Sequence, residues 1–145
     1  MAHTFSQNHV HVVFSTKDRR KIICKALQPE LWAYLAGISI NHDMRAFAAN
    51  GTDSHVHILL RVPPAIVLSK AVMLLKANSS KWMSEKVRDF VWQEGYGAFS
   101  ASNLNAVVRY IQNQLVHRRK TSFEDEFRAL LRKHRVEYDP KFLFG

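Results

Sequence analysis

The sequence contains one cysteine, Cys24, and this scarcity excludes an internal disulfide and any zinc site built from several cysteines. Glycine and proline are also few, at 5 and 4 residues, and the sequence has no low-complexity tract, internal repeat or interdomain linker. No apolar run approaches the about 20 residues that are needed to span a bilayer. Residues 1–6 lack the charged-then-apolar pattern of a signal peptide. We therefore expect a cytoplasmic protein with no membrane partner.

Acidic residues are the minority charge. Twelve Asp and Glu stand against 21 Lys and Arg, which gives a formal net charge of +9 and a pI near 10.0. This balance favours a polyanionic partner, because each phosphate that a protein neutralises releases counterions and strengthens binding. The alternative is a merely basic, soluble surface, but clustering of the basic residues favours nucleic acid. The clusters are 17–21, the series Lys70, Lys76 and Lys81, 117–120, and 132–135.

Hydrophobic periodicity predicts one domain over residues 1–145, with four strands and four helices. Apolar residues alternate along the predicted strands and recur every three or four positions along the predicted helices. The strands are 9–15, 44–49, 54–62 and one that ends near Ser100, and the helices are 29–41, 67–86, 104–120 and 123–134.

The order of these elements predicts an α+β fold of the ferredoxin-like, split βαβ kind. In this plan an antiparallel sheet has its helices on one face, and additional helices follow at the C-terminal end. Between the second and third strands, the Asn50-Gly51 pair predicts a tight hairpin turn.

Two histidines alternate with apolar residues along the third predicted strand. Because side chains alternate across a strand, the apolar residues from Val56 to Leu60 share one face, and His55 and His57 share the other. The two imidazoles are then roughly 7 Å apart at their Cα atoms, which is close enough to bind one ion. The alternative is that they only fill a half-polar sheet surface.

The first predicted strand repeats this pattern with His9 and His11. In the predicted topology the first and third strands are central neighbours, so up to four histidines could lie on an open face of the sheet. The sequence does not assign a role to His9 or His11.

The helix predicted over 104–120 carries a second candidate group beside its core face. Tyr110, Gln114 and His117 form a stripe at positions i, i+4 and i+7. A tyrosine next to a core face is often an anchor whose hydroxyl finds a partner. The functional alternative is a nucleophile, and a phenol with a pKa near 10 then needs an electrophile that a metal ion polarises. The predicted core face itself consists of Leu104, Val107, Val108, Ile111 and Leu115.

Together the strand and the helix predict one site. His55 and His57 would supply two nitrogen ligands to a divalent ion, and the Gln114 oxygen a third, one turn from Tyr110. The ion would keep open positions for a phosphate oxygen and water. The Tyr110 hydroxyl would then attack phosphorus in line and form a covalent phosphotyrosine link, which permits strand transfer without ATP.

The chain resembles the single-tyrosine HUH transposases of insertion sequences, an IS200-like family whose relatives include REP-associated tyrosine transposases. Segment 53–60 resembles the His-hydrophobic-His motif of that family, and segments 92–100 and 109–114 are similar to its second half. Segments 13–17 and 76–82 also resemble the family, so the likeness covers nearly the whole chain.

The resemblance implies an enzyme that binds hairpins near the ends of a mobile element. It implies cleavage and rejoining of single-stranded DNA through a 5′-phosphotyrosine, with Mg²⁺ or Mn²⁺ as cofactor. It also implies a homodimer in which the tyrosine helix of one subunit can serve the histidines of the other. Carried over residue by residue, His55, His57 and Gln114 are the ligands and Tyr110 is the nucleophile.

Two positions depart from the family pattern, because Ser54 stands where relatives often have Asp and Ala77 where Gly is common. Neither removes a ligand, but both leave the activity of this copy open. The alternatives are a non-catalytic nucleic-acid-binding module, a replication-initiator or relaxase-type nickase, and a domesticated relative. An RNA-binding sheet is disfavoured because histidines stand where its aromatic pair belongs.

Phosphate contacts would position DNA without reading its sequence. Trp92 and Phe99 could stack on an unpaired base, but both are predicted to belong to the core. The candidate DNA-binding residues are Lys17, Arg19 and Arg20 after the first strand, Lys76 and Lys81 on the second helix, and Arg109, Arg118 and Arg119 beside the tyrosine stripe.

Overall fold

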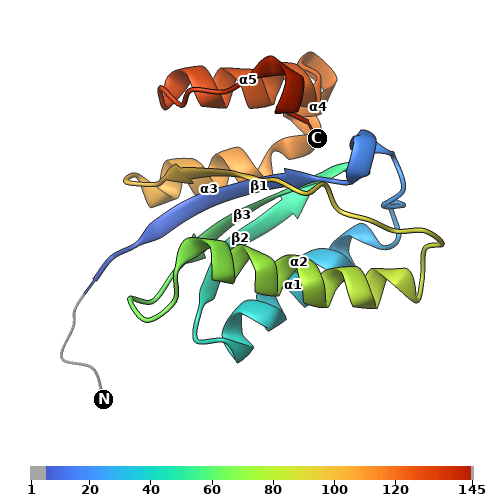
Figure 1. Ribbon diagram of the computed structural model, residues 1–145, viewed down its shortest axis with the longest axis horizontal. Coiled ribbons are helices and arrows are strands. Elements are labelled where there is room, and N and C mark those ends of the chain that lie inside the picture. Colours follow the sequence, from blue (N-terminus) through green and yellow to red (C-terminus); the bar gives the residue numbers. More distant parts are fainter. Residues whose placement is uncertain (1–5, 145) are drawn as a thin grey trace.

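The computed structural model describes residues 6–144 and contains one antiparallel sheet in the order β2-β3-β1-β4 (Figure 1). This order, with helices between β1 and β2 and between β3 and β4, confirms the predicted ferredoxin-like plan. The strands are β1 (His9–Ser15), β2 (Arg45–Gly51), β3 (His55–Arg61) and β4 (Gly97–Ser100). The helices are α1 (Gln28–Asn41), α2 (Leu68–Ser84), α3 (Leu104–Gln112), α4 (Gln114–Lys120) and α5 (Phe123–Lys133).

The main core lies between the sheet and the layer of α1 and α2 (Figure 1). Apolar residues at alternating positions of β1 and β3 point into it, as the period of two predicts. Trp92 belongs to this core and is 6% exposed, which confirms its predicted place. The sheet members of the core are Val10, Val12 and Phe14 of β1 with Val56, Ile58 and Leu60 of β3.

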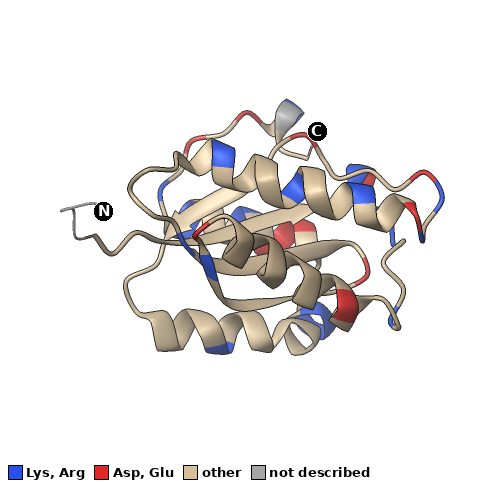
Figure 2. Ribbon diagram, turned by 90° about the horizontal axis from the view of Figure 1, so that it is seen from below, with Lys and Arg blue, Asp and Glu red and all other residues tan. Residues whose placement is uncertain are grey.

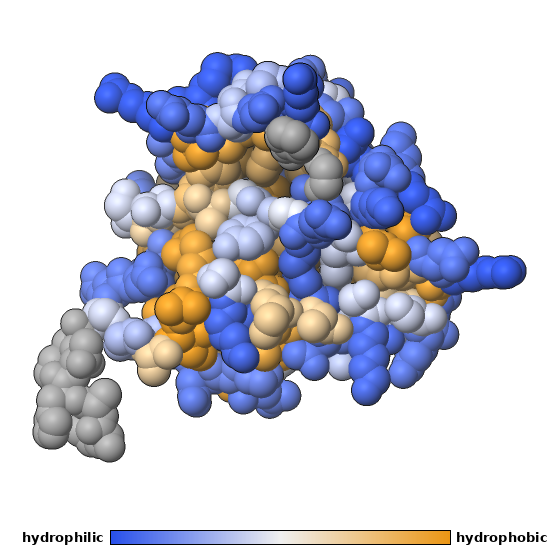
Figure 3. Space-filling model, viewed as in Figure 1, coloured by the Kyte–Doolittle hydropathy of each residue, from blue (hydrophilic) through white to orange (hydrophobic). Residues whose placement is uncertain are grey.

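The opposite face of the sheet is covered as well, so the prediction of helices on one face and an open histidine face is wrong. Figure 1 shows that α3, α4 and α5 lie on the opposite side of the sheet from α1 and α2. A second apolar cluster joins Val13 and Phe99 of the sheet to Phe123, Phe127, Leu130 and Leu131 of α5. In the space-filling view, hydrophobic residues lie between this upper layer and the rest of the molecule (Figure 3).

The turn between β2 and β3 lies later than predicted. Asn50 and Gly51 belong to β2 and pair with His57 and Val56, so they are not the turn itself. The turn is formed by the residues from Thr52 to Ser54, and the Thr52 amide donates to the His55 carbonyl at 3.0 Å. Backbone hydrogen bonds donated by other segments to the carbonyls of Asp53 and Ser54 hold the turn in this register.

The helix predicted over 104–120 is broken at Asn113, whose φ of −96° and ψ of 24° leave the helical region. The Asn50 side-chain amide donates to the Ile111 and Gln112 carbonyls, at 3.0 and 3.1 Å, and so satisfies acceptors that a continuous helix would have used. The break changes which side of the chain is buried. Gln114 is fully buried, whereas Leu115, predicted to lie on the core face, is 56% exposed.

No helix in the described part of the chain has the length and apolar character needed to cross a membrane.

The close approach of β2 to the turn predicts a strong effect of substituting Gly51. A Cβ at Gly51 would lie 2.0 Å from the His55 carbonyl oxygen, so the backbone must shift. We expect Gly51→Ala to lower the free energy of unfolding by about 1–3 kcal/mol. Gly37→Ala is the matched control, because a Cβ there has nothing within 4 Å and α1 gains helix propensity, which stabilises by about 0.5–1 kcal/mol. Urea unfolding of both variants checks the prediction, and equal effects would contradict it.

Candidate active site

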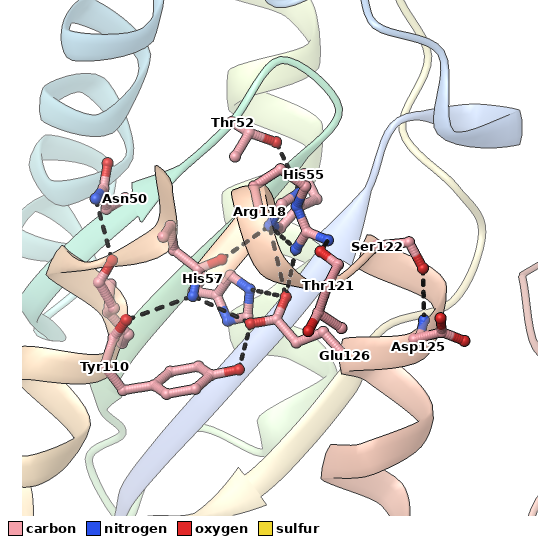
Figure 4. A network of polar contacts seen from close by, with 12 residues as sticks. Asn50, Thr52, His55, His57, Tyr110, Arg118, Thr121, Ser122, Asp125 and Glu126 are labelled. Carbon is pink, nitrogen blue, oxygen red and sulfur yellow. Dashed lines mark hydrogen bonds and ion pairs between the residues drawn. The ribbon is translucent and has the colours of Figure 1, made fainter. Parts of the chain in front are cut away.

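The two histidines of β3 converge on one point through their Nε2 atoms (Figure 4). Both side chains are completely buried, and their ring centroids are 5.1 Å apart. The Nδ1 atom of each ring faces a polar partner, namely Thr52 Oγ1 at 2.9 Å from His55 and His11 Nε2 at 2.8 Å from His57. These partners fix the ring orientations and leave the Nε2 atoms to face the C-terminal helices.

His11, for which no role was predicted, is part of this arrangement. It faces Leu59 across the β1–β3 pair, and His57 faces Val13, so the two histidines are diagonal neighbours on one face. His9 lies at the other end of β1, beside Phe47 of β2, with ring centroids 5.4 Å apart. Only His11 of the first-strand histidines therefore supports the site.

Burial keeps the histidines neutral. Burial, followed by the charge of His57, lowers the pKa of His11 and of His55 to about 3. Burial also lowers the pKa of His57, although the Glu126 carboxylate opposes the shift. The rings are thus unprotonated at neutral pH, which is the form that a metal ion requires.

Tyr110 of α3 and Gln114 of α4 reach the same place from the helical layer. Gln114 Oε1 lies 3.0 Å from His55 Nε2, so the structure brings together the predicted ligands from strand and helix. The Tyr110 ring lies 5.8 Å from the His57 ring, centroid to centroid. All four predicted residues therefore meet within one chain.

Glu126 of α5 lies at the centre of the site and was not among the residues predicted from the sequence. Its Oε1 atom lies 3.5 Å from His57 Nε2 and 4.0 Å from His55 Nε2. Its Oε2 atom accepts hydrogen bonds from the Tyr110 hydroxyl and, at 3.3 Å, from the Gln114 amide. One signal could have revealed it, because Glu126 shares the helical stripe of Phe123 and Leu130, where an acidic residue is unexpected.

The acid and the phenol influence each other's ionisation. Burial raises the pKa of the Tyr110 phenol, and the neighbouring Glu126 carboxylate raises it further. Burial alone would raise the pKa of Glu126, but His57, Tyr110 and His55 hold it well below its usual range. The site at neutral pH therefore holds a carboxylate beside a protonated phenol.

Arg118 of α4 is the counterion of Glu126. Its Nη2 atom lies 2.6 Å from Glu126 Oε1 and 3.4 Å from His55 Nε2, and its Nη1 atom donates to the Thr121 carbonyl at 2.7 Å. The sequence placed Arg118 among the DNA-binding residues, whereas in the structure its guanidinium closes the site (Figure 4).

The residues present fit a divalent metal ion. One donor atom from each of His55, His57 and Glu126 lies within 4.8 Å of the others, and all three side chains are buried. Among the residues that the structure describes, His57 Nε2 is a buried atom without a hydrogen-bond partner. A buried imidazole nitrogen that lacks a partner and lies near a carboxylate oxygen is a donor arrangement that a divalent metal ion can use.

Two hollows, of about 290 and 270 Å³, give access to the tyrosine. One also borders His11 and the start of α3, and the other borders His117 and Glu126. Both are lined by Tyr110, Leu130 and Lys133. The Tyr110 side chain can therefore be reached from outside through both hollows.

The predicted DNA-binding residues lie on different elements, and Figure 2 shows Lys and Arg spread over several parts of the molecule. Arg109 and Arg119 are exposed on the helices that carry the site. Arg19 instead contacts the C-terminal segment, where it donates to the Phe144 carbonyl at 3.3 Å. Lys17 and Arg20 are exposed beside it, and Lys81 is exposed on α2, in the layer beyond the sheet.

Lys76 has an intramolecular role. Its ammonium group donates to the carbonyls of Gln93, Glu94 and Gly95, at 2.6, 3.2 and 2.8 Å, and so fixes the loop before β4. Burial lowers its pKa to about 8. These bonds leave Lys76 poorly suited to contact phosphate.

Comparison with known proteins agrees with this geometry. The sequence matches the family described as "transposase IS200 like" over residues 4–114, which is most of the chain. The chain belongs to the IS200-like transposase family. The transposase for insertion sequence element IS200 of Salmonella typhimurium is 27% identical over 124 residues, which cover 79% of this chain and 82% of that relative. The transposase for the same element of Salmonella typhi matches equally well.

Two solved structures share the transposase fold. A chain from Deinococcus radiodurans R1 that is assigned as a transposase has a TM-score of 0.64 at 21% identity, with 79% of this chain and 95% of that chain covered. The REP-associated tyrosine transposase bound to a REP hairpin has a TM-score of 0.62 at 12% identity, with 81% and 72% covered. The resemblance seen in the sequence is thereby confirmed, and membership of the family implies a DNA-cleaving enzyme.

Because His11 is neutral when folded, we predict that acid destabilises the transposase partly through this residue. In the unfolded chain His11 is protonated below about pH 6.5, whereas in the folded protein it stays neutral down to about pH 3. The contribution of His11 to the free energy of unfolding is therefore fully present above pH 6.5 and is lost as the pH falls from 6.5 to 3. His11→Asn does not titrate and should lose less stability on acidification, by roughly 1 kcal/mol per pH unit at most. His9→Asn, on the same strand but partly exposed, is the control and should behave as wild type. Urea unfolding at pH 7 and pH 5 checks this, and equal losses in all three proteins would contradict it.

Proposed function

We propose that this transposase cleaves and rejoins single-stranded DNA at hairpin-marked element ends through a 5′-phosphotyrosine intermediate. The observation that carries the proposal is the meeting of the half-buried Tyr110 with the buried side chains of His55, His57 and Gln114. This is the set of groups that the reaction requires, namely a nucleophile beside a place for a divalent ion.

We propose His55, His57 and Gln114 as ligands of Mg²⁺ or Mn²⁺. A bound divalent ion polarises a phosphoryl oxygen and stabilises the charge that develops at phosphorus. Thr52 and His11 contact the Nδ1 atoms of the two imidazoles, which would leave each Nε2 atom available to bind the ion. Gln114 is held in turn by the hydrogen bond that its side-chain amide donates to Glu126 Oε2 at 3.3 Å.

Tyr110 is the proposed nucleophile. Its raised pKa keeps the phenol protonated before the reaction, and Glu126 Oε2 already accepts the hydroxyl hydrogen bond. As the phenol oxygen bonds to phosphorus, its proton leaves along the hydrogen bond to Glu126 Oε2 and on to solvent. The bond from phosphorus to the 3′ oxygen breaks, and the departing 3′ oxygen takes up a proton from solvent. The leaving strand keeps a 3′ hydroxyl, and a second strand can reverse the same steps.

The expected partner is DNA with a hairpin, and a bound hairpin in a protein of similar fold supports it. Arg109 and Arg119 are the strongest candidates for phosphate contacts, because both are exposed on the helices that carry the site. The homodimer and the cytoplasmic location stay predictions from the sequence. A domesticated relative that binds or cuts hairpins without mobilising an element is the second candidate, and the two departures at Ser54 and Ala77 favour considering it.

Removing the nucleophile should abolish the covalent intermediate. With Mn²⁺ and a single-stranded oligonucleotide that carries the flanking hairpin, we expect wild type to form a protein–DNA adduct on denaturing gels. Tyr110→Phe should form none, because it lacks the attacking oxygen. Tyr34→Phe is the control, since Tyr34 stacks on Trp82 in the layer beyond the sheet and keeps its ring. An adduct with Tyr110→Phe would show that another residue attacks, and no adduct with wild type would favour the non-catalytic alternative.

Mixing two inactive variants tests whether one subunit holds a complete site. Tyr110 and the histidines converge within one chain, so a mixture of Tyr110→Phe and His57→Ala should form no adduct. A complementing mixture would instead mean that the tyrosine of one subunit serves the histidines of the other. Wild type diluted with each variant separately controls for inhibition by the inactive partner.

A further inference from the structure

We propose that Glu126 is a further ligand of the divalent ion and that Arg118 takes the place of the ion until the ion displaces it. The proposal rests on the metal-dependent function given above and adds two residues to it. Both residues lie beyond positions 4–114, where the family match ends.

The distances around Glu126 are those of groups that surround one ion. Neighbouring ligands of an octahedral ion with bonds of about 2.1 Å lie about 3.0 Å apart, and opposite ligands about 4.2 Å apart. Glu126 Oε1 lies 3.5 Å from His57 Nε2 and 4.0 Å from His55 Nε2, within this range. Gln114 Oε1 lies 3.0 Å from His55 Nε2, which is the separation of neighbouring ligands.

The orphaned nitrogen gives independent support. His57 Nε2 is buried and lacks a hydrogen-bond partner within residues 6–144, although it points toward a carboxylate. If the His57 ring carried its proton on Nε2, a short hydrogen bond to Glu126 would be expected. The 3.5 Å separation instead leaves room for a cation between the two atoms.

Arg118 marks the position of that cation. Its Nη2 atom contacts both Glu126 Oε1, at 2.6 Å, and His55 Nε2, at 3.4 Å, which are two of the atoms that would bind the ion. A guanidinium group and a divalent cation cannot share these atoms, because like charges repel at such distances. The Arg118 side chain is 21% exposed, so it can turn outward when the ion enters.

The two oxygens of Glu126 would then have separate tasks. Oε1 faces the histidines and Arg118, whereas Oε2 holds the Tyr110 hydroxyl and the Gln114 amide. Binding of the ion at Oε1 therefore fixes the nucleophile at Oε2. A carboxylate also suits the charge, since two neutral imidazoles and an amide offer no negative charge to a hard dication.

Direct binding of Mn²⁺ to the full chain without DNA tests this assignment. The free Mn²⁺ signal in electron paramagnetic resonance gives the dissociation constant without any activity measurement. Glu126→Gln keeps the size of the side chain and should bind Mn²⁺ at least about tenfold more weakly. Arg118→Met removes the competing charge and should bind it about tenfold more tightly, a gain that misfolding cannot produce.

Matched variants control for charge alone. Glu124→Gln changes the same charge on α5 at a residue paired with Arg19, and Arg132→Ala removes an exposed positive charge from α5. Both should bind Mn²⁺ within about twofold of wild type.

The outcomes separate the inference from the proposed function. If wild type binds Mn²⁺, His57→Ala does not, and Glu126→Gln binds as tightly as wild type or more tightly, Glu126 is not a ligand and only this inference falls. An unchanged or weaker affinity in Arg118→Met would overturn the exchange between Arg118 and the ion. If wild type binds no Mn²⁺, the metal-dependent function and this inference fall together.

Discussion

The site depends on one constraint, the burial of the histidine face of the sheet. Once α5 covers β1 and β3, the nitrogens of His11, His55 and His57 lose water and need partners inside the protein. Thr52 and the His11–His57 pair satisfy the Nδ1 side of the two β3 histidines. Only the Nε2 side is left, and it faces Glu126 and Gln114. The geometry for binding a cation is thus a consequence of covering a polar strand face.

Helix α5, which buries the histidines, also carries the Glu126 carboxylate that faces their Nε2 atoms. Phe123, Phe127, Leu130 and Leu131 bind α5 to the sheet, and burial of each contributes roughly 1.5–3 kcal/mol. A buried carboxylate such as Glu126 costs free energy unless it is paired and hydrogen-bonded. Tyr110 and Arg118 supply those partners. The apolar contacts of α5 therefore keep the Glu126 carboxylate buried, although burial by itself is unfavourable for a carboxylate.

Strand alternation was sufficient to predict the histidine pair, because a period of two leaves only one assignment of His55 and His57 against Val56 and Ile58. Local patterns failed where a distant residue decides the conformation. The Asn50 side chain donates hydrogen bonds to the Ile111 and Gln112 carbonyls. These bonds stabilise a break in the helix at Asn113, which helical periodicity cannot reveal. The break turns Gln114 inward in place of Leu115. Glu126 was missed for a related reason, since the histidines that it faces lie on β3, more than 60 positions earlier.

The charges of the site also suggest an order of binding. Without an ion, Arg118 and Glu126 cancel, and the neutral histidines and Tyr110 add nothing, so the buried cluster has little attraction for a phosphate. If a divalent ion replaced Arg118, the ion and the Glu126 carboxylate together would have a net charge of about +1, and the Arg118 guanidinium would be released toward solvent. The positive charge would then attract a phosphate oxygen, and the released Arg118 guanidinium would be available nearby as a bidentate donor. The site would therefore bind the scissile phosphate strongly only after the ion is bound. Arg118 and Glu126, which set this order, lie beyond residues 4–114, over which the family model matches.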